Sequence, residues 1–205
     1  MKFRKPILFA SIVSLFVITV NAQPAESKVT VADSLTQNAT VVTYTNDINI
    51  EVESVDKVSM KVHKVYSVLN EEGKRALLFT EFSTKFKVLD YVEIRVYDSK
   101  GKQVGKYKKG DMRTTAYGEG LVDDGFVTYF PIQVLSYPVI VDLTYEKKFK
   151  STLEIPAFRF LHEKEGVLQS SYTIKIPSEI NLRYHNNGCN LTPSVTSNDK
   201  SKTYV

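Results

Sequence analysis

The sequence is poor in the residues that most often build catalytic and metal sites. Its 205 residues contain one cysteine, three histidines and no tryptophan. The single cysteine, Cys189, excludes an internal disulfide, so the folded domain depends on its hydrophobic core. The three histidines lack the spacing of transition-metal ligands: they are His63, His162 and His185. We therefore expect neither a transition-metal site nor a cofactor.

Cys189 is the residue that an enzyme would use as a nucleophile. It follows His185 by four positions in the run His-Asn-Asn-Gly-Cys. Cysteine catalysis requires a base and an orienting group that the fold brings together, and a short turn does not provide them. We interpret the thiol as structural or incidental and predict that the chain has no catalytic residue. An enzyme that depends on Cys189 is the last-ranked alternative.

Three further groups have both a structural and a functional interpretation. Glu119, Asp123 and Asp124 lie in a glycine-containing loop and could contact calcium, but the Asp/Gly spacing of a calcium loop is absent, so we predict no metal site. Five lysines crowd one predicted hairpin and are interpreted as protection of a sheet edge: Lys100, Lys102, Lys106, Lys108 and Lys109. Five tyrosines could form a sugar-binding platform, although they also suit a sheet surface: Tyr91, Tyr97, Tyr107, Tyr117 and Tyr129.

The chain also lacks a strong excess of charge. Its formal charge of +4 includes Lys2, Arg4 and Lys5, which belong to a segment that we expect to be removed. Without these three, 24 of the 27 basic residues remain, against 23 acidic residues. We therefore predict no nucleic-acid partner and no attraction to an anionic membrane.

Residues 1–22 have the layout of a cleavable signal peptide. A basic start precedes an apolar run from Ile7 to Val20, and the small residues of Val20-Asn21-Ala22 follow. The run is shorter than the roughly 20 residues of a membrane-spanning helix. We expect a periplasmic or secreted product with no membrane segment after cleavage. Residues 23–38 are small and polar, and we interpret them as a linker.

No segment has the periodicity of a three-turn amphipathic helix, and the rest of the chain alternates with the period of a strand. The clearest case has Val139, Val141, Leu143 and Tyr145 at every second position and Asp142, Thr144 and Glu146 in the gaps. We assign the apolar set to the core and Asp142 and Glu146 to the solvent face. About nine such strands, separated by turn residues, predict an all-β antiparallel β-sandwich over residues 39–205, with a barrel as the second choice.

Several of these segments together resemble a known family. They are the signal peptide, Val68-Leu69-Asn70-Glu71-Glu72-Gly73-Lys74, Asp98-Ser99-Lys100-Gly101-Lys102, the Tyr137 to Glu146 strand, and Tyr172-Thr173-Ile174-Lys175-Ile176-Pro177. The family is the exported bacterial domain of unknown function 3857, common in Bacteroidetes, which precedes a transglutaminase-like domain.

The resemblance implies a β-sandwich module whose chemistry resides in a later Cys-His-Asp domain. This chain ends before such a domain, so it is either a fragment of a longer protein, truncated at its C-terminus, or a module that stands alone. The first hypothesis is a non-catalytic accessory module that packs against, or positions substrate for, a transglutaminase-like or peptidase-like domain, in cis or in trans. The alternative is a free-standing module that binds a cell-surface glycan or peptide.

Overall fold

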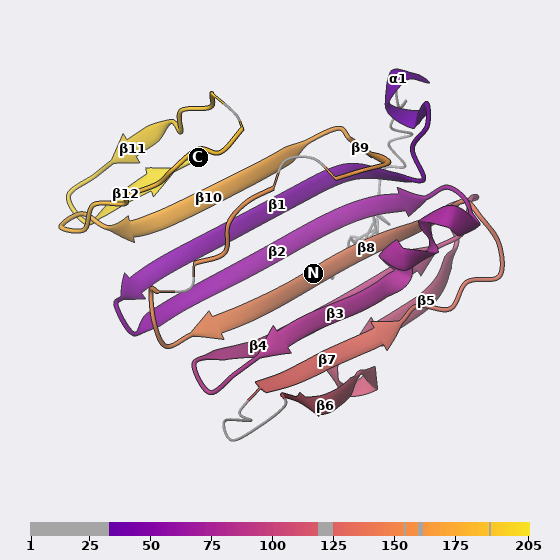
Figure 1. Ribbon diagram of the computed structural model, residues 1–205, viewed down its shortest axis with the longest axis horizontal. Coiled ribbons are helices and arrows are strands. Elements are labelled where there is room, and N and C mark those ends of the chain that lie inside the picture. Colours follow the sequence, from indigo (N-terminus) through magenta and orange to yellow (C-terminus); the bar gives the residue numbers. More distant parts are fainter. Residues whose placement is uncertain (1–32, 119–124, 154, 160–161, 189) are drawn as a thin grey trace, which may run out of the picture.

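Two β-sheets make up most of the computed structural model, which describes residues 33–118, 125–153, 155–159, 162–188 and 190–205 (Figure 1). The large sheet has the order β11 (Val195–Ser197), β12 (Ser201–Tyr204), β10 (Ser170–Pro177), β1 (Val41–Ser54), β2 (Lys57–Val68), β8 (Val139–Phe149), β4 (Lys87–Tyr97) and β5 (Gln103–Lys108), and β9 (Glu165–Val167) also pairs with β1. The small sheet has the order β3 (Leu78–Ser83), β7 (Gly125–Pro131) and β6 (Arg113–Tyr117).

Helical structure among the described residues is limited to three short pieces. They are α1 (Asp33–Thr36) and the 3-10 helices η1 (Glu71–Leu77) and η2 (Lys109–Asp111). No helix in this part of the chain is long and apolar enough to cross a membrane. The predicted signal peptide, residues 1–22, lies outside the described residues, as does the linker before Asp33.

The predicted all-β, two-sheet fold is confirmed, and the second choice, a closed barrel, is wrong. Two details differ from the expectation of about nine antiparallel strands. The described residues contain twelve strands rather than about nine, and three of the twelve, β9, β11 and β12, are short. The large sheet is mixed, because β1 runs parallel to β9 and β10 while it runs antiparallel to β2.

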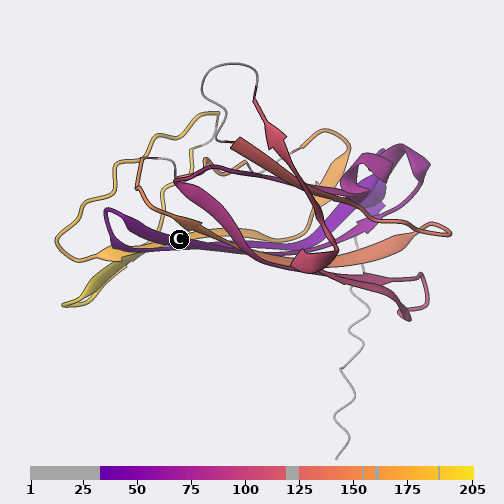
Figure 2. The same cartoon turned by 90° about the horizontal axis from the view of Figure 1, so that it is seen from below.

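The hydrophobic core covers one face of the large sheet. The small sheet lies on that same side (Figure 2). Between the sheets, a first cluster buries Val92, Ile94, Val96 and Val141 with inward residues of the small sheet such as Phe79. In the sequence these positions of β4 and β8 alternate with polar residues, so the period-2 pattern indicates the inward face of both strands correctly.

A second core cluster lies at the other end of the same face. Its buried residues come from four adjacent strands: Ile50, Val52, Val58, Met60, Val62, Phe149, Ile174 and Ile176. Ile155, Ile180 and Leu182 pack against this cluster from segments without regular structure. Irregular chain therefore covers the part of the sheet that the small sheet leaves open.

A buried ion pair joins the two sheets. Lys147 in β8 donates to Glu81 in β3, and the side chains of the two residues are only 8% and 18% exposed. Glu81 also shares a hydrogen bond with the Tyr145 hydroxyl; burial, the Glu81 charge and this bond together raise the pKa of Tyr145. Burial of both charges is costly unless they stay paired, so this contact fixes how the small sheet sits on the large one.

Close backbone packing holds the first described residues against the sheet. The glycine at position 166 in β9 lies so near the carbonyl oxygen of Leu35 that an added Cβ atom would be 2.2 Å from it. Tyr66 holds the 3-10 helix η1, which connects β2 to β3, because its buried hydroxyl donates to the Ala76 carbonyl oxygen at 2.8 Å. The first contact ties Leu35 to β9, which pairs with β1, and the second ties η1 to β2.

Candidate functional site

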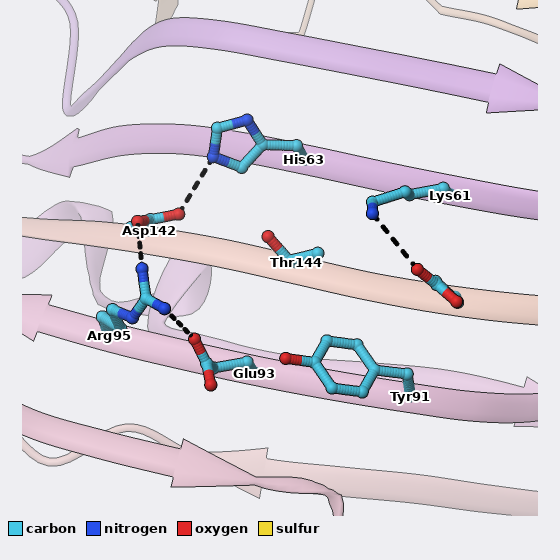
Figure 3. Close-up of a pocket in the computed structure, with 8 residues that line it drawn as sticks. Lys61, His63, Tyr91, Glu93, Arg95, Asp142 and Thr144 are labelled. Atoms are coloured by element: carbon cyan, nitrogen blue, oxygen red, sulfur yellow. Dashed lines mark hydrogen bonds and ion pairs between the residues drawn. The ribbon is translucent and has the colours of Figure 1, made fainter.

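The outer face of the large sheet, opposite the core, carries the charged side chains. Because residues paired across neighbouring strands share a face, the register places His63 of β2 beside Thr144 of β8 and Glu93 of β4. The next row aligns Lys61, Glu146 and Tyr91. These rows line a hollow of about 290 Å³ on the open face of the sheet (Figure 3).

A chain of polar and ionic contacts crosses this hollow from β2 to β4 (Figure 3) and continues to Lys106 of β5. His63 Nε2 lies 3.0 Å from Asp142 Oδ1, and Asp142 Oδ2 lies 3.7 Å from Arg95 Nη1. Arg95 also pairs with Glu93, whose other oxygen is 3.4 Å from Lys106 Nζ. Each charge therefore has an opposite charge on an adjacent strand or residue, which keeps the local net charge close to zero.

The residues joined by these contacts stabilise one another's charged forms. Desolvation opposes ionisation of Glu93, but Arg95 and Lys106 outweigh it and hold the pKa of Glu93 below its ordinary value. The pKa of Arg95 is raised, because Glu93 and Asp142 outweigh the desolvation that would lower it. Glu93 is accordingly an anion across the neutral pH range and is unsuited to act as a general acid there.

Polar side chains continue along the same face toward β10. Lys61 Nζ lies 3.3 Å from Glu146 Oε1, and Lys175 Nζ lies 2.8 Å from Glu51 Oε1. A neighbouring hollow includes all four of these residues, so the polar surface extends from β4 across β8, β2 and β1 to β10.

Asp142 and Glu146 lie on this outer face, as their alternation with the core residues indicated. Asp142 is nevertheless partly covered, because its side chain is 23% exposed between His63 and Arg95, whereas that of Glu146 is 40% exposed. In the sequence, Glu93 and Arg95 occupy polar positions of one strand and His63 a polar position of another. Their meeting around Asp142 was missed, since only the register of three strands brings them together.

The five tyrosines considered for sugar binding are divided among separate surfaces. Tyr91 and Tyr97 lie on the outer face of the large sheet, whereas Tyr107 packs against the first core cluster, with its ring 4.5 Å from that of Phe130. Tyr117 and Tyr129 belong to the small sheet. A single platform of all five tyrosines is therefore wrong, and Tyr91 alone lines the hollow.

The lysines predicted to protect an edge are found at an edge strand. Lys106 and Lys108 belong to β5, which ends the strand order of the large sheet, and Lys100 and Lys102 lie at the turn before it. Lys109 differs, because it reaches back to donate to the Leu89 carbonyl oxygen. Four of the five positions thus agree with the edge interpretation.

The structure describes only some of the candidate metal ligands and nucleophiles. Among the described residues, no group of three or more His, Cys, Asp and Glu side chains is arranged to hold a metal ion. Glu119, Asp123, Asp124 and Cys189 lie outside the described residues. His162 and His185 are exposed, and His162 acts electrostatically on Glu165 rather than on the hollow.

A second polar cluster lies at the junction of β1, β2 and β9. Glu165 accepts hydrogen bonds from the buried Thr43 hydroxyl and from Lys64 Nζ, the latter at 2.9 Å. Burial would raise the pKa of Glu165, but these two bonds and the positive charge of Lys64 outweigh it, so its pKa is lowered. The cluster links three strands through one carboxylate oxygen, Glu165 Oε1.

Comparison with protein-family models identifies the fold family. A model described as a domain of unknown function with solved structure, DUF3857, matches residues 55–205. The chain belongs to the DUF3857 family. The resemblance drawn from its strand and turn segments is thereby confirmed for the family itself. Comparison with curated proteins finds no match to this DUF3857 chain.

Solved structures align with this DUF3857 domain at low sequence identity. A proposed protease from Parabacteroides distasonis aligns over 80% of this chain with 11% identity and a TM-score of 0.61. The alignment covers 35% of that protein, so the DUF3857 chain spans about a third of its length. An M1 zinc metallopeptidase from Deinococcus radiodurans aligns over 81% of this chain and 38% of its own, with 8% identity and a TM-score of 0.35.

Proposed function

We propose that this DUF3857 domain is a non-catalytic accessory module of a peptidase-like or transglutaminase-like system. It packs against the catalytic domain, or positions substrate for it, and that domain lies in the same polypeptide or in a separate one. We further propose that the module acts in the periplasm or outside the cell.

The observation that carries the proposal is the fold likeness to one part of a larger protein. The proposed protease from Parabacteroides distasonis contains this β-architecture within 35% of its chain, which leaves about two thirds for other domains. The polar face supports a role without chemistry. Its histidine contacts a carboxylate that also faces Arg95, and among the described residues no cysteine or serine side chain lines this hollow as a nucleophile for it.

The proposal is tested with the purified chain and the transglutaminase-like or peptidase-like domain encoded in the same or an adjacent reading frame. We expect the chain alone to hydrolyse neither casein nor a mixed peptide library. We expect the catalytic domain to bind the chain and to show a changed KM for protein substrates in its presence. Hydrolysis by the chain itself, or the absence of any such domain beside its gene, would contradict the proposal.

A second candidate function, binding of a cell-surface glycan or peptide, is favoured by the hollow on the large sheet. Its charges are mutually paired and Tyr91 offers a ring that is 41% exposed, which suits a neutral ligand with many hydrogen-bonding groups. A glycan array and a peptide array, each probed with the labelled chain, test this function. Tyr91→Ala should abolish binding, whereas Tyr117→Ala, on the other sheet, should not. The candidate fails if neither array gives a signal, or if the two variants behave alike.

A further inference from the structure

The outer face of the small sheet differs sharply from that of the large one. Phe79 and Glu81 show which positions of β3 point inward, because Phe79 packs in the core and Glu81 pairs with Lys147 of the large sheet. The strand pairing then places nine residues outward: Leu78, Thr80, Phe82, Arg113, Thr115, Tyr117, Val127, Tyr129 and Pro131. Only one of them, Arg113, is charged.

Large apolar side chains on this face are exposed to solvent. Leu78 is 49% exposed, Phe82 is 46% exposed and Tyr117 is 62% exposed. The Phe82 and Tyr117 rings meet edge to face across β7, with centroids 5.2 Å apart. Gly125, the residue of β7 that pairs with Tyr117, has no side chain to separate them. Contiguous exposed apolar surface of this kind marks a site of protein association.

We propose that this outer face, defined by the nine residues above, is the surface on which the catalytic domain docks. The inference rests on the proposed function and adds the surface and the chemistry of its partner. The partner surface is apolar and carries a carboxylate that meets Arg113.

Charge complementarity selects this partner over a second copy of the chain. In a symmetric contact of two small sheets, the nine outward residues supply no carboxylate to either Arg113. Each guanidinium would then lose water without gaining an anion, which is unfavourable. The edge-to-face angle of 74° between Phe82 and Tyr117 also disfavours a sugar, because the two rings do not form a flat platform.

Binding of the cognate transglutaminase-like or peptidase-like domain to four forms of the chain tests the inference by calorimetry. The forms are the wild type, Phe82→Ser/Tyr117→Ser, Arg113→Glu, and the control Tyr184→Ser, at a tyrosine that is 52% exposed and lies outside both sheets. We expect the double variant and Arg113→Glu each to weaken binding at least tenfold, as for central interface residues. Tyr184→Ser should bind within about twofold of the wild type. Arg113 is exposed, so its variant reports on docking even if the double variant fails to fold.

The outcomes separate this inference from the proposed function. If the wild type binds and both test variants bind equally well, this surface is wrong and the accessory role stands. If the wild type does not bind, both are wrong. A photo-crosslinker placed at position 82 should join the chain to the catalytic domain; a crosslink to a second copy of the chain would overturn the choice of partner.

Discussion

The strongest stability prediction concerns the buried ion pair between the sheets. Replacement of Lys147 by methionine keeps the length of the side chain but leaves the Glu81 carboxylate without its cation. Because the two side chains are only 8% and 18% exposed, solvent cannot replace the lost partner. Removal of one member of a buried pair costs about 3 to 5 kcal/mol, and the residual exposure of Glu81 favours the lower end, about 3 kcal/mol.

That loss is a large fraction of the total, because a domain is typically stable by about 5 to 15 kcal/mol. The second substitution should reverse most of it. In Lys147→Met/Glu81→Gln no buried charge remains, and the glutamine oxygen can still accept from the Tyr145 hydroxyl. We therefore expect the double variant to lie within about 1 kcal/mol of the wild type, since uncharged replacements of buried pairs are often neutral.

Urea unfolding followed by circular dichroism gives the free energies for the four corners of this cycle. Lys148→Met is the matched control, because Lys148 is the next residue but points to the opposite face with a side chain that is 65% exposed. Its effect should stay within about 0.5 kcal/mol. If Lys147→Met and Lys148→Met destabilise equally, the ion pair does not hold the two sheets together and this reasoning is refuted.

Three further predictions concern the packing around β1 and β2. Gly166→Ala should lower the free energy of unfolding by about 1 to 3 kcal/mol, since its Cβ would overlap a backbone oxygen, whereas Gly110→Ala, which meets nothing within 4 Å, should be neutral in the same melts. Glu165 has a lowered folded-state pKa, so its stabilising contribution is complete above about pH 4.5 and is lost as the pH falls through the folded value; Glu165→Gln should flatten the acid side of a stability–pH curve. Tyr66→Phe should cost about 1 kcal/mol in urea unfolding, because the Ala76 carbonyl oxygen loses the hydroxyl donor of the buried Tyr66 side chain.

The strands that could be predicted from the sequence are those with one apolar and one polar face. In β4 and β8 the alternation runs without interruption from Val92 to Val96 and from Val139 to Tyr145, and the structure buries the predicted set. Lys147 breaks the pattern, because it is a lysine at an inward position of β8. Its partner Glu81 lies 66 residues earlier in the chain, so no local pattern could show that the charge would be buried and paired.

Turn residues gave a less specific signal. The polar residues and the glycine of Asn70 to Lys74 favour a turn, which predicts a return strand from Ala76. The structure instead contains the 3-10 helix η1, with Asn70 as its N-cap, and β3 begins at Leu78. The same small polar residues favour turns and helix caps, because in both their side chains bond to nearby backbone amides.

The candidate site could be predicted from the sequence less well than the fold. Each polar position around the hollow was visible in its own strand, but the contact of Asp142 with both His63 and Arg95 depends on how β2, β8 and β4 align. The outward apolar face of the small sheet was also missed, since exposed Phe82 has the same local pattern as a core residue. The distinction requires knowledge of which face the rest of the chain covers.

The parallel pairing of β1 with β10 has a consequence for the time that the chain spends incomplete. Asn46 and its hydrogen-bonded partner Ser170 are 124 residues apart, so one edge of β1 has no partner strand until β9 and β10 have been made. At about 5 to 20 residues per second, the ribosome needs roughly 6 to 25 s to synthesise that interval. During this time the unpaired edge of β1 can pair with a strand of another nascent chain. The yield of folded domain should therefore depend most on chaperones that bind the unfolded chain during this interval.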